Sequence, residues 1–134
     1  MSLLESCVSL AVISAITMIA VPRLMETRED YVLTSAARDV ATKMHSARIR
    51  AISQSRDCRL RVTSTVAYAI ECQDPAWMLA EAVVVPRGIM VAANARPEFH
   101  PLGNVSPTAT FTLTNRKGHQ RKIVVNNGGR IRIQ

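Results

Sequence analysis

The chain has 134 residues, of which 48% are hydrophobic, so it can form one compact domain with a core and is not a disordered tail. Only 4% of the residues are aromatic, which excludes a surface that binds nucleic acid by stacking bases on aromatic rings. The 17 Lys and Arg outnumber the 10 Asp and Glu, and the net charge of +7 indicates an anionic partner: nucleic acid, a lipid surface or an acidic protein. The sequence contains no C-x-x-C spacing, no glycine-rich phosphate loop and no nucleophile motif. We therefore expect no metal site, no cofactor and no enzymatic activity.

Residues 1–21 form a nearly uninterrupted apolar run that contains one charge, Glu5. An α-helix of this length could just cross a hydrocarbon core of about 30 Å. The run lacks the basic n-region and the small-residue cleavage site of a secretory signal peptide. A buried core helix is the alternative, but such helices are seldom apolar on all sides in so small a domain. We therefore expect this run to insert into a membrane.

After Pro22, apolar residues recur at spacings of three and four with charged residues between them, which predicts an amphipathic helix with one packing face. The residues of this face are Leu33, Ala36, Ala37, Val40, Ala41, Met44, Ala47, Ala51 and Ile52. Since no glycine and only one proline occur in this part of the chain, we expect one helix, kinked at Pro22 and ending near Ser55. The expected divisions are a membrane and assembly half of the helix (1–25), an amphipathic half (26–56) and a β-rich globular domain (57–134).

From Cys58 onward the sequence is typical of strands. Alternation in 58–62 and 67–72 predicts a hairpin that places Cys58 opposite Cys72 if Thr65 lies at its centre. These cysteines either form a disulfide in an oxidising compartment or are two ordinary small residues. Further strands are expected at 81–85, 88–92, 108–114, 121–125 and 130–133, with turns at 115–118 and 126–129 and a loop around Trp77. The expected fold class is α+β: a long N-terminal helix packed on a mostly antiparallel sheet.

Four segments of the sequence resemble a known family. Residues 1–25 resemble the start of mature type IV pilins and pseudopilins, in which an apolar helix carries a Glu at the fifth position and a Pro near the twenty-second, here Glu5 and Pro22. Three further segments resemble the FimT/GspH minor pilins (pseudopilins): HSARIRAIS at 45–53, FHPLG at 99–103 and RKIVVNNGGRIRI at 121–133.

This resemblance implies a pilin-like protein with a single pass through the inner membrane and a periplasmic domain, assembled with other pilin subunits into a pilus or pseudopilus at the cell surface. It implies that Met1, which stands where the family usually has Phe, is the terminus left by a prepilin peptidase and a site of N-methylation. It also implies that Glu5 pairs with the α-amine of a neighbouring subunit during assembly. Without the resemblance, Glu5 is better explained as a carboxylate that caps the helix at the lipid interface.

The C-terminal quarter of the chain is strongly basic. No acidic residue follows Glu98, whereas six basic residues do: Arg116, Lys117, Arg121, Lys122, Arg130 and Arg132. Alternation predicts that Arg130 and Arg132 project to one face of a strand, where their forked guanidinium groups can engage successive phosphates. The isoleucines that alternate with them, Ile131 and Ile133, are expected to face the core, and Gly128 and Gly129 to let the turn approach a phosphate closely.

Residues 129–132, Gly-Arg-Ile-Arg, match the G-R-x-R motif associated with DNA binding in FimT-type minor pilins. The resemblance implies that Gly129, Arg130 and Arg132, with the four other basic residues, bind the DNA phosphate backbone without sequence preference, for DNA uptake in natural transformation. Three alternatives stay open. The charges can lie on a solvated edge strand and block its pairing with other strands. They can form the basic face of a type II secretion pseudopilin or structural filament subunit that does not bind nucleic acid. They can also form a surface that lies on anionic lipid.

Overall fold

The computed structural model describes residues 2–134 and has two compact units, a first that ends at Tyr31 and a second, Val32–Gln134. A single helix, α1 (Leu3–Gln54), runs through the boundary and continues past Pro22. The boundary falls inside the segment expected to be the amphipathic half of the helix (26–56). The globular unit therefore contains the helix from residue 32 onward as well as the β-rich part of the chain.

The packing face of α1 in the second unit is the predicted one at all but one position. Eight of the nine predicted residues are buried: Leu33, Ala36, Ala37, Val40, Ala41, Met44, Ala47 and Ala51. The prediction was wrong for Ile52, which is 47% exposed because it lies in the last turn of the helix and borders the surface loop at Gly103. Helical periodicity predicts which residues share a face, but it does not predict where the covering sheet ends.

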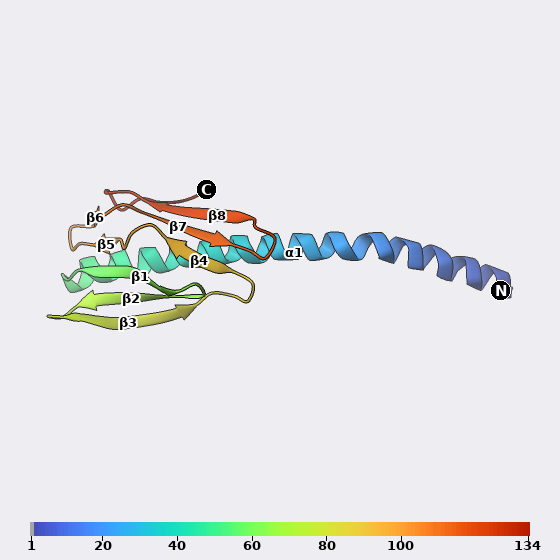
Figure 1. The fold of residues 1–134 in the computed structure, drawn as a ribbon, viewed down its shortest axis with the longest axis horizontal. Coiled ribbons are helices and arrows are strands. Elements are labelled where there is room, and N and C mark those ends of the chain that lie inside the picture. The colour runs from blue at the N-terminus through green and yellow to red at the C-terminus, as the bar shows by residue number, and fades with distance from the viewer. Residues whose placement is uncertain (1) are drawn as a thin grey trace. The chain divides into compact units, whose positions relative to one another are not determined.

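The strands of the second unit form two antiparallel sheets (Figure 1). The five-stranded sheet has the order β3-β2-β1-β5-β6, with β1 (Cys58–Ser64), β2 (Ala67–Gln73), β3 (Trp77–Val84), β5 (Glu98–Phe99) and β6 (Val105–Ser106). The four-stranded sheet has the order β4-β7-β8-β9, with β4 (Met90–Ala93), β7 (Ala109–Thr114), β8 (Gln120–Val125) and β9 (Ile131–Ile133). The helix and both sheets contribute to one cluster of buried side chains, which lies entirely within the second unit. The α+β class is confirmed.

The β1–β2 hairpin has the expected register, with Leu60 opposite Ile70 and Cys58 opposite Cys72 around a centre at Thr65. The two cysteines are joined by a disulfide with a Cα–Cα distance of 4.0 Å. The next strand, β3, begins at Trp77, where the sequence suggested a loop. Trp77 pairs with Gln73, and the guanidinium of Arg59 lies 4.1 Å from the centre of its ring, so the aromatic residue lies within the sheet.

Candidate nucleic-acid interface

The charges of the second unit are very unevenly distributed. It contains 15 Lys and Arg and 6 Asp and Glu, a net charge of +9, and its last carboxylate is Glu98. None of the four strands of the β4-β7-β8-β9 sheet, and neither of the turns that join β7, β8 and β9, contains an acidic residue. The cations of this sheet therefore have no acidic side chain on the same sheet.

In the five-stranded sheet, by contrast, Glu71 and Glu81 are held by basic side chains. Glu71, whose side chain is only 10% exposed, accepts hydrogen bonds at 2.7 Å from both Arg59 and Arg61. Burial alone would raise the pKa of Glu71, but the hydrogen bonds and positive charges of these arginines outweigh it and hold that pKa below its ordinary value. Glu81 is bound by Lys43 and by Arg50 of the helix.

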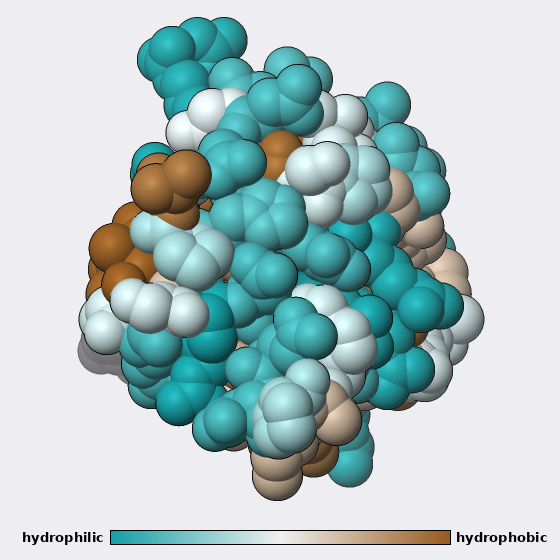
Figure 2. All heavy atoms as spheres, turned by 90° about the vertical axis from the view of Figure 1, so that its left-hand side faces the viewer, coloured by the Kyte–Doolittle hydropathy of each residue, from teal (hydrophilic) through white to brown (hydrophobic). Residues whose placement is uncertain are grey.

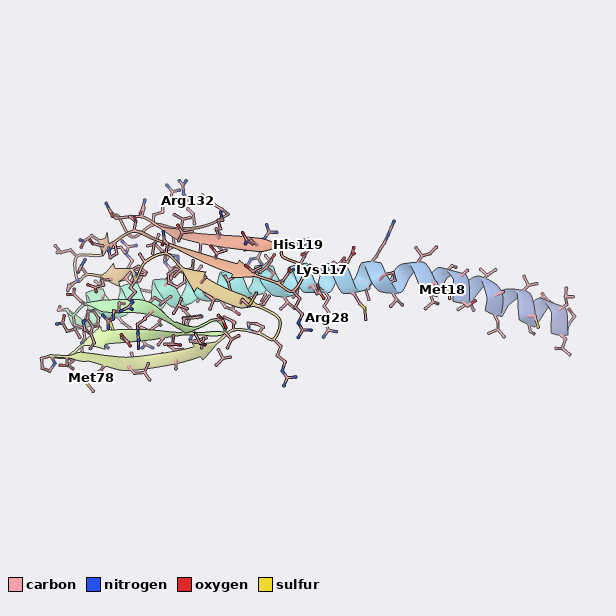
Figure 3. The ribbon with its side chains drawn as sticks, in the orientation of Figure 1. Met18, Arg28, Met78, Lys117, His119 and Arg132 are labelled. Atoms are coloured by element: carbon pink, nitrogen blue, oxygen red, sulfur yellow. A yellow bond between two sulfur atoms is a disulfide. The ribbon has the colours of Figure 1, made fainter. Side chains whose placement is uncertain are left out.

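The outer face of the β4-β7-β8-β9 sheet carries the predicted cations in a strip along the β8–β9 hairpin. Lys122 lies opposite Thr112 of β7, and Arg132 lies opposite Val124 of β8, so both side chains lie on the face opposite the buried residues. Backbone hydrogen bonds of 2.9 and 2.7 Å between Lys122 and Gln134 fix the two strands side by side. Figure 3 shows Arg132 projecting away from the fold.

Arg130 precedes β9 rather than lying within it. The Oδ1 atom of Asn126 accepts a hydrogen bond of 2.9 Å from the Arg130 backbone N–H, which closes the predicted turn at 126–129. Within the chain that the structure describes, no ion pair is found for Arg130, Arg132, Lys122 or Arg121. All four side chains are exposed. The predicted alternation places Arg132 on the outer face, whereas Arg121 lies opposite the buried Leu113 of β7 and therefore on the other face of the sheet.

The isoleucines of β9 face the core as expected. Ile131 lies opposite Val125 and Ile133 opposite Ile123, on the core side of the sheet. Ile133 is nevertheless 41% exposed. The reason is that β9 is an edge strand of three residues with no further strand to cover it.

The other predicted cations lie toward the far end of the hairpin. Arg116 and Lys117 lie in the β7–β8 turn, where Figure 3 shows Lys117 at the opposite end of β8 from the 126–129 turn. The side chain of Arg116 packs over Gly88, with its Nε 3.1 Å from where a Cβ would lie on that glycine. The structure therefore groups Arg130, Arg132 and Lys122 and places Arg116 and Lys117 apart from them, with Arg121 between.

The backbone of Gly129 was expected to approach a phosphate, but it is enclosed by other parts of the protein. It is buried, with a φ of +77°, and a Cβ there would lie 2.4 Å from the carbonyl oxygen of Gly103 and 2.7 Å from Nε of Arg48. Its backbone is therefore not open to a phosphate, and Gly129 shapes the turn that carries Arg130. Gly128 is exposed.

Figure 2 views the end of the second unit at which the 126–129 turn lies. The surface there is mostly hydrophilic, with its largest hydrophobic patch at one edge.

Arg48 is a residue that the sequence analysis did not single out. Its Nε donates a hydrogen bond of 3.0 Å to the carbonyl of Gly103, and its Nη2 lies 3.5 Å from the carbonyl of Gly128. Arg48, Gly103 and Gly129 belong to three of the four segments that resemble the family, at 45–53, 99–103 and 121–133. That shared resemblance was the available signal that the three segments meet.

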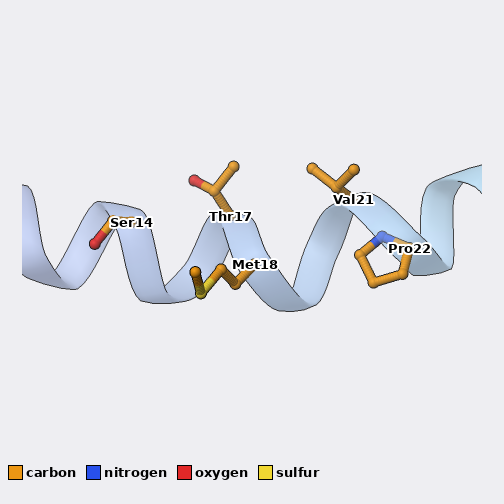
Figure 4. Close-up of a pocket in the computed structure, with 5 residues that line it drawn as sticks. All are labelled: Ser14, Thr17, Met18, Val21 and Pro22. Atoms are coloured by element: carbon orange, nitrogen blue, oxygen red, sulfur yellow. The ribbon is translucent and has the colours of Figure 1, made fainter.

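The described part of the first unit before Pro22 is apolar and exposed. The structure has a helix that is long and apolar enough to cross a membrane, and none of its most apolar 18-residue window is buried. Figure 4 shows an open groove beside Pro22, lined by Ser14, Thr17, Met18 and Val21. Because Pro22 has no N–H, it cannot donate to the Met18 carbonyl in the preceding turn.

Glu5 lies in the first turn of α1, where its backbone N–H lies 3.3 Å from the Oγ of Ser2. This Ser-x-x-Glu arrangement is typical of a capping box, and a carboxylate there also interacts favourably with the helix dipole. The side chain of Glu5 is exposed. Met1, the expected processing and methylation site, lies outside the described residues.

Comparisons with known proteins agree with this fold. The sequence model of the family described as "Type II transport protein GspH" matches residues 36–129, more than half of the chain. No curated protein matches the chain significantly. The minor pseudopilin EpsH of the type 2 secretion system of Vibrio cholerae has a similar structure, with a TM-score of 0.66 and 13% identity over 76% of this chain and 95% of that one. The type IV minor pilin FimU of Pseudomonas aeruginosa has a TM-score of 0.65 and 19% identity, over 79% of this chain and 90% of that one. The chain belongs to the GspH family of pilin-like proteins.

Proposed function

We propose that the protein is a minor pilin that binds DNA without sequence preference, for DNA uptake in natural transformation. The observation that carries the proposal is the acid-free outer face of the β4-β7-β8-β9 sheet, on which Lys122 and Arg132 lie on adjacent strands and Arg130 follows the turn. Contacts to phosphates supply most of the affinity of non-specific DNA binding, and forked guanidinium groups suit phosphate oxygens.

The half-exposed threonines of β7 extend this face. Thr110 and Thr112 alternate with the buried Ala109, Phe111 and Leu113, so their hydroxyls lie on the outer side, beside Val124 and Lys122. Threonine hydroxyls commonly contact phosphate oxygens in protein–DNA complexes. No aromatic side chain occupies the outer face among the described strands of this sheet, which agrees with contact to the backbone rather than to bases.

We further propose that α1 anchors the protein by a single pass in the inner membrane and that the second unit is periplasmic. The exposed apolar side chains of residues 3–21 then contact lipid first and other pilin subunits after assembly into a pilus. In the assembled state Glu5 pairs with the α-amine of a neighbouring subunit, and a prepilin peptidase acts before assembly. The disulfide between Cys58 and Cys72 suits an oxidising compartment.

A second candidate function is a pseudopilin of a type II secretion system. It is favoured by the description of the matching family and by the structural similarity to EpsH. In that case the same basic face contacts acidic surfaces of partner pilins and has no role with nucleic acid. The two functions differ in one measurable property, the affinity of the isolated protein for DNA.

The test is a DNA titration of the full chain in detergent micelles, comparing wild type with the double variant Arg130→Ala, Arg132→Ala. Removing two forked phosphate contacts at about 1–3 kcal/mol each should weaken binding at least 30-fold. The matched control is Arg87→Ala, Arg96→Ala, which removes two exposed arginines next to β4, at the other edge of the sheet. This control loses the same net charge and should weaken binding less than threefold.

Equal losses in the two double variants would show that net charge alone attracts DNA and would remove the assignment of a binding face. Absence of binding by the wild-type protein at low salt would reject the DNA-binding function and favour the secretion pseudopilin. Thermal unfolding of each variant checks that the fold is retained. We expect it to be retained, because all four arginines are exposed and none contributes to the core.

A further inference from the structure

The guanidinium of Arg48 connects the helix to two loops. Arg48 lies on the part of α1 within the second unit and is half-buried. Within the part of the chain that the structure describes, its guanidinium donates to the carbonyl of Gly103, at 3.0 Å, and to that of Gly128, at 3.5 Å, rather than to a carboxylate. Gly103 belongs to the loop between β5 and β6, and Gly128 belongs to the turn between β8 and β9. One planar fork therefore joins three segments that are far apart in the sequence.

Both loops have a glycine at the point where Arg48 packs. A Cβ on Gly103 would lie 3.1 Å from Nη2 of Arg48, and a Cβ on Gly129 would lie 2.7 Å from its Nε. Both glycines have positive φ values, +86° and +77°, which residues with a side chain rarely adopt. The close approach of the guanidinium and the shape of both loops thus depend on the absence of side chains at these positions.

The 126–129 turn is held from two other directions as well. The Asn127 carbonyl accepts a hydrogen bond of 2.8 Å from the Val105 backbone N–H in β6, and Asn126 bonds to Arg130 across the turn. Arg48 adds the connection to the helix. The backbone from which Arg130 projects is therefore fixed before any ligand arrives.

We infer that Arg48 is a positioning residue for DNA binding: it holds the 126–129 turn so that Arg130 and Arg132 are presented together. The inference rests on the proposed function and adds the residue that orders its binding face. Ordering the turn during folding avoids the entropic cost of ordering it during binding. A lysine at position 48 would keep the charge, but it cannot supply two donors in a planar fork.

The variant Arg48→Lys in the full chain tests this inference, since it leaves the net charge at +7. We expect DNA binding at least fivefold weaker than wild type. We also expect faster hydrogen exchange at the Gly129 and Arg130 amides, whose hydrogen bonds of 3.0 and 2.9 Å close the turn. The control Arg38→Lys changes an exposed arginine of the same helix and should alter neither measurement.

A second pair of variants keeps the inference testable if Arg48→Lys does not fold. Gly129→Ala places a methyl group against Arg48, whereas Gly118→Ala introduces the same backbone strain, at a φ of +84°, with nothing among the described residues within 4 Å of the new Cβ. We expect Gly129→Ala to bind DNA at least fivefold more weakly than Gly118→Ala.

The positioning role would be overturned if Arg48→Lys bound DNA as tightly as the wild type, or if Gly129→Ala bound DNA as tightly as Gly118→Ala. Either result would leave the DNA-binding function intact. Failure of the wild-type protein itself to bind would instead reject the proposed function. The two failures are thus distinguished within one set of titrations.

Discussion

The two sheets of the globular unit use arginine in opposite ways. In the five-stranded sheet, Arg59 and Arg61 converge on the nearly buried carboxylate of Glu71, so both have an acidic partner inside the protein. In the β4-β7-β8-β9 sheet, Arg132 and Lys122 lie on a face without any carboxylate. Both sheets pack against the same core, and both contain basic residues on their outer sides.

The difference shows that the number of basic residues does not indicate where a charged ligand binds. A cation that already has an internal partner contributes to stability and offers little to an anion from solution, because its partner must first be displaced. A cation without an internal partner keeps its full attraction for an external anion. The function we propose therefore depends on where acidic residues are absent, as much as on where basic ones occur.

The largest effect that sharpens this comparison is expected at Glu71. Replacing it by glutamine, Glu71→Gln, leaves Arg59 and Arg61 without their shared carboxylate in a partly buried site. Because both arginines stay charged, we expect the free energy of unfolding to fall by about 2–3 kcal/mol. Urea unfolding measures this loss. DNA affinity should be unchanged or slightly higher, because the variant gains one net positive charge. A weaker affinity would show that the two sheets are not separate in function.

The pH dependence of the same residue has a definite sign. Since the pKa of Glu71 is lowered in the folded state, its ionised form stabilises the fold above the ordinary value of 4.5, and this contribution is lost as the pH falls through the folded-state pKa. The stability difference between wild type and Glu71→Gln should therefore shrink as the pH falls below 4.5. A difference that stays constant as the pH is lowered would contradict the ion-pair explanation.

A smaller effect is expected from giving the second sheet the carboxylate that it lacks. Thr112 lies directly opposite Lys122, so Thr112→Glu places a negative charge within reach of that ammonium group. Neutralising Lys122 and repelling phosphates should weaken DNA binding about tenfold, or about 1.4 kcal/mol, with little change in stability. The control Thr112→Gln has a similar size and no charge. Equal affinities of the two variants would mean that this face does not contact DNA.

Much of the fold could be predicted from the sequence because its signals are local. Spacings of three and four predicted the buried face of α1, and alternation with turn residues predicted the β1–β2 register and the β7–β8–β9 turns. The two-residue strands β5 and β6 are too short to show any alternation. The start of β3 at Trp77 depends on stacking with Arg59, a contact between strands that local patterns do not contain.

The basic residues of the candidate site could be predicted from the sequence, but the contacts that hold them in place could not. The run of basic residues after Glu98 is visible in the sequence, and its alternation correctly places Arg132 on the outer face. Arg48 contacts Gly103, which lies 55 residues later in the sequence, and Gly129, which lies 81 residues later. No local pattern predicts contacts over such distances. The burial of Gly129 followed from that packing, so the expectation that its backbone approaches a phosphate was wrong.

The central claim, that the acid-free sheet binds DNA phosphates, is tested most directly by the salt dependence of binding. Titrations of the full wild-type chain with duplex DNA at several salt concentrations give the slope of log K against log[salt]. If about four phosphates are neutralised, the slope should be near −3.6, with counterions released as each contact forms. A slope close to zero, or no measurable binding at the lowest salt concentration, would contradict the account.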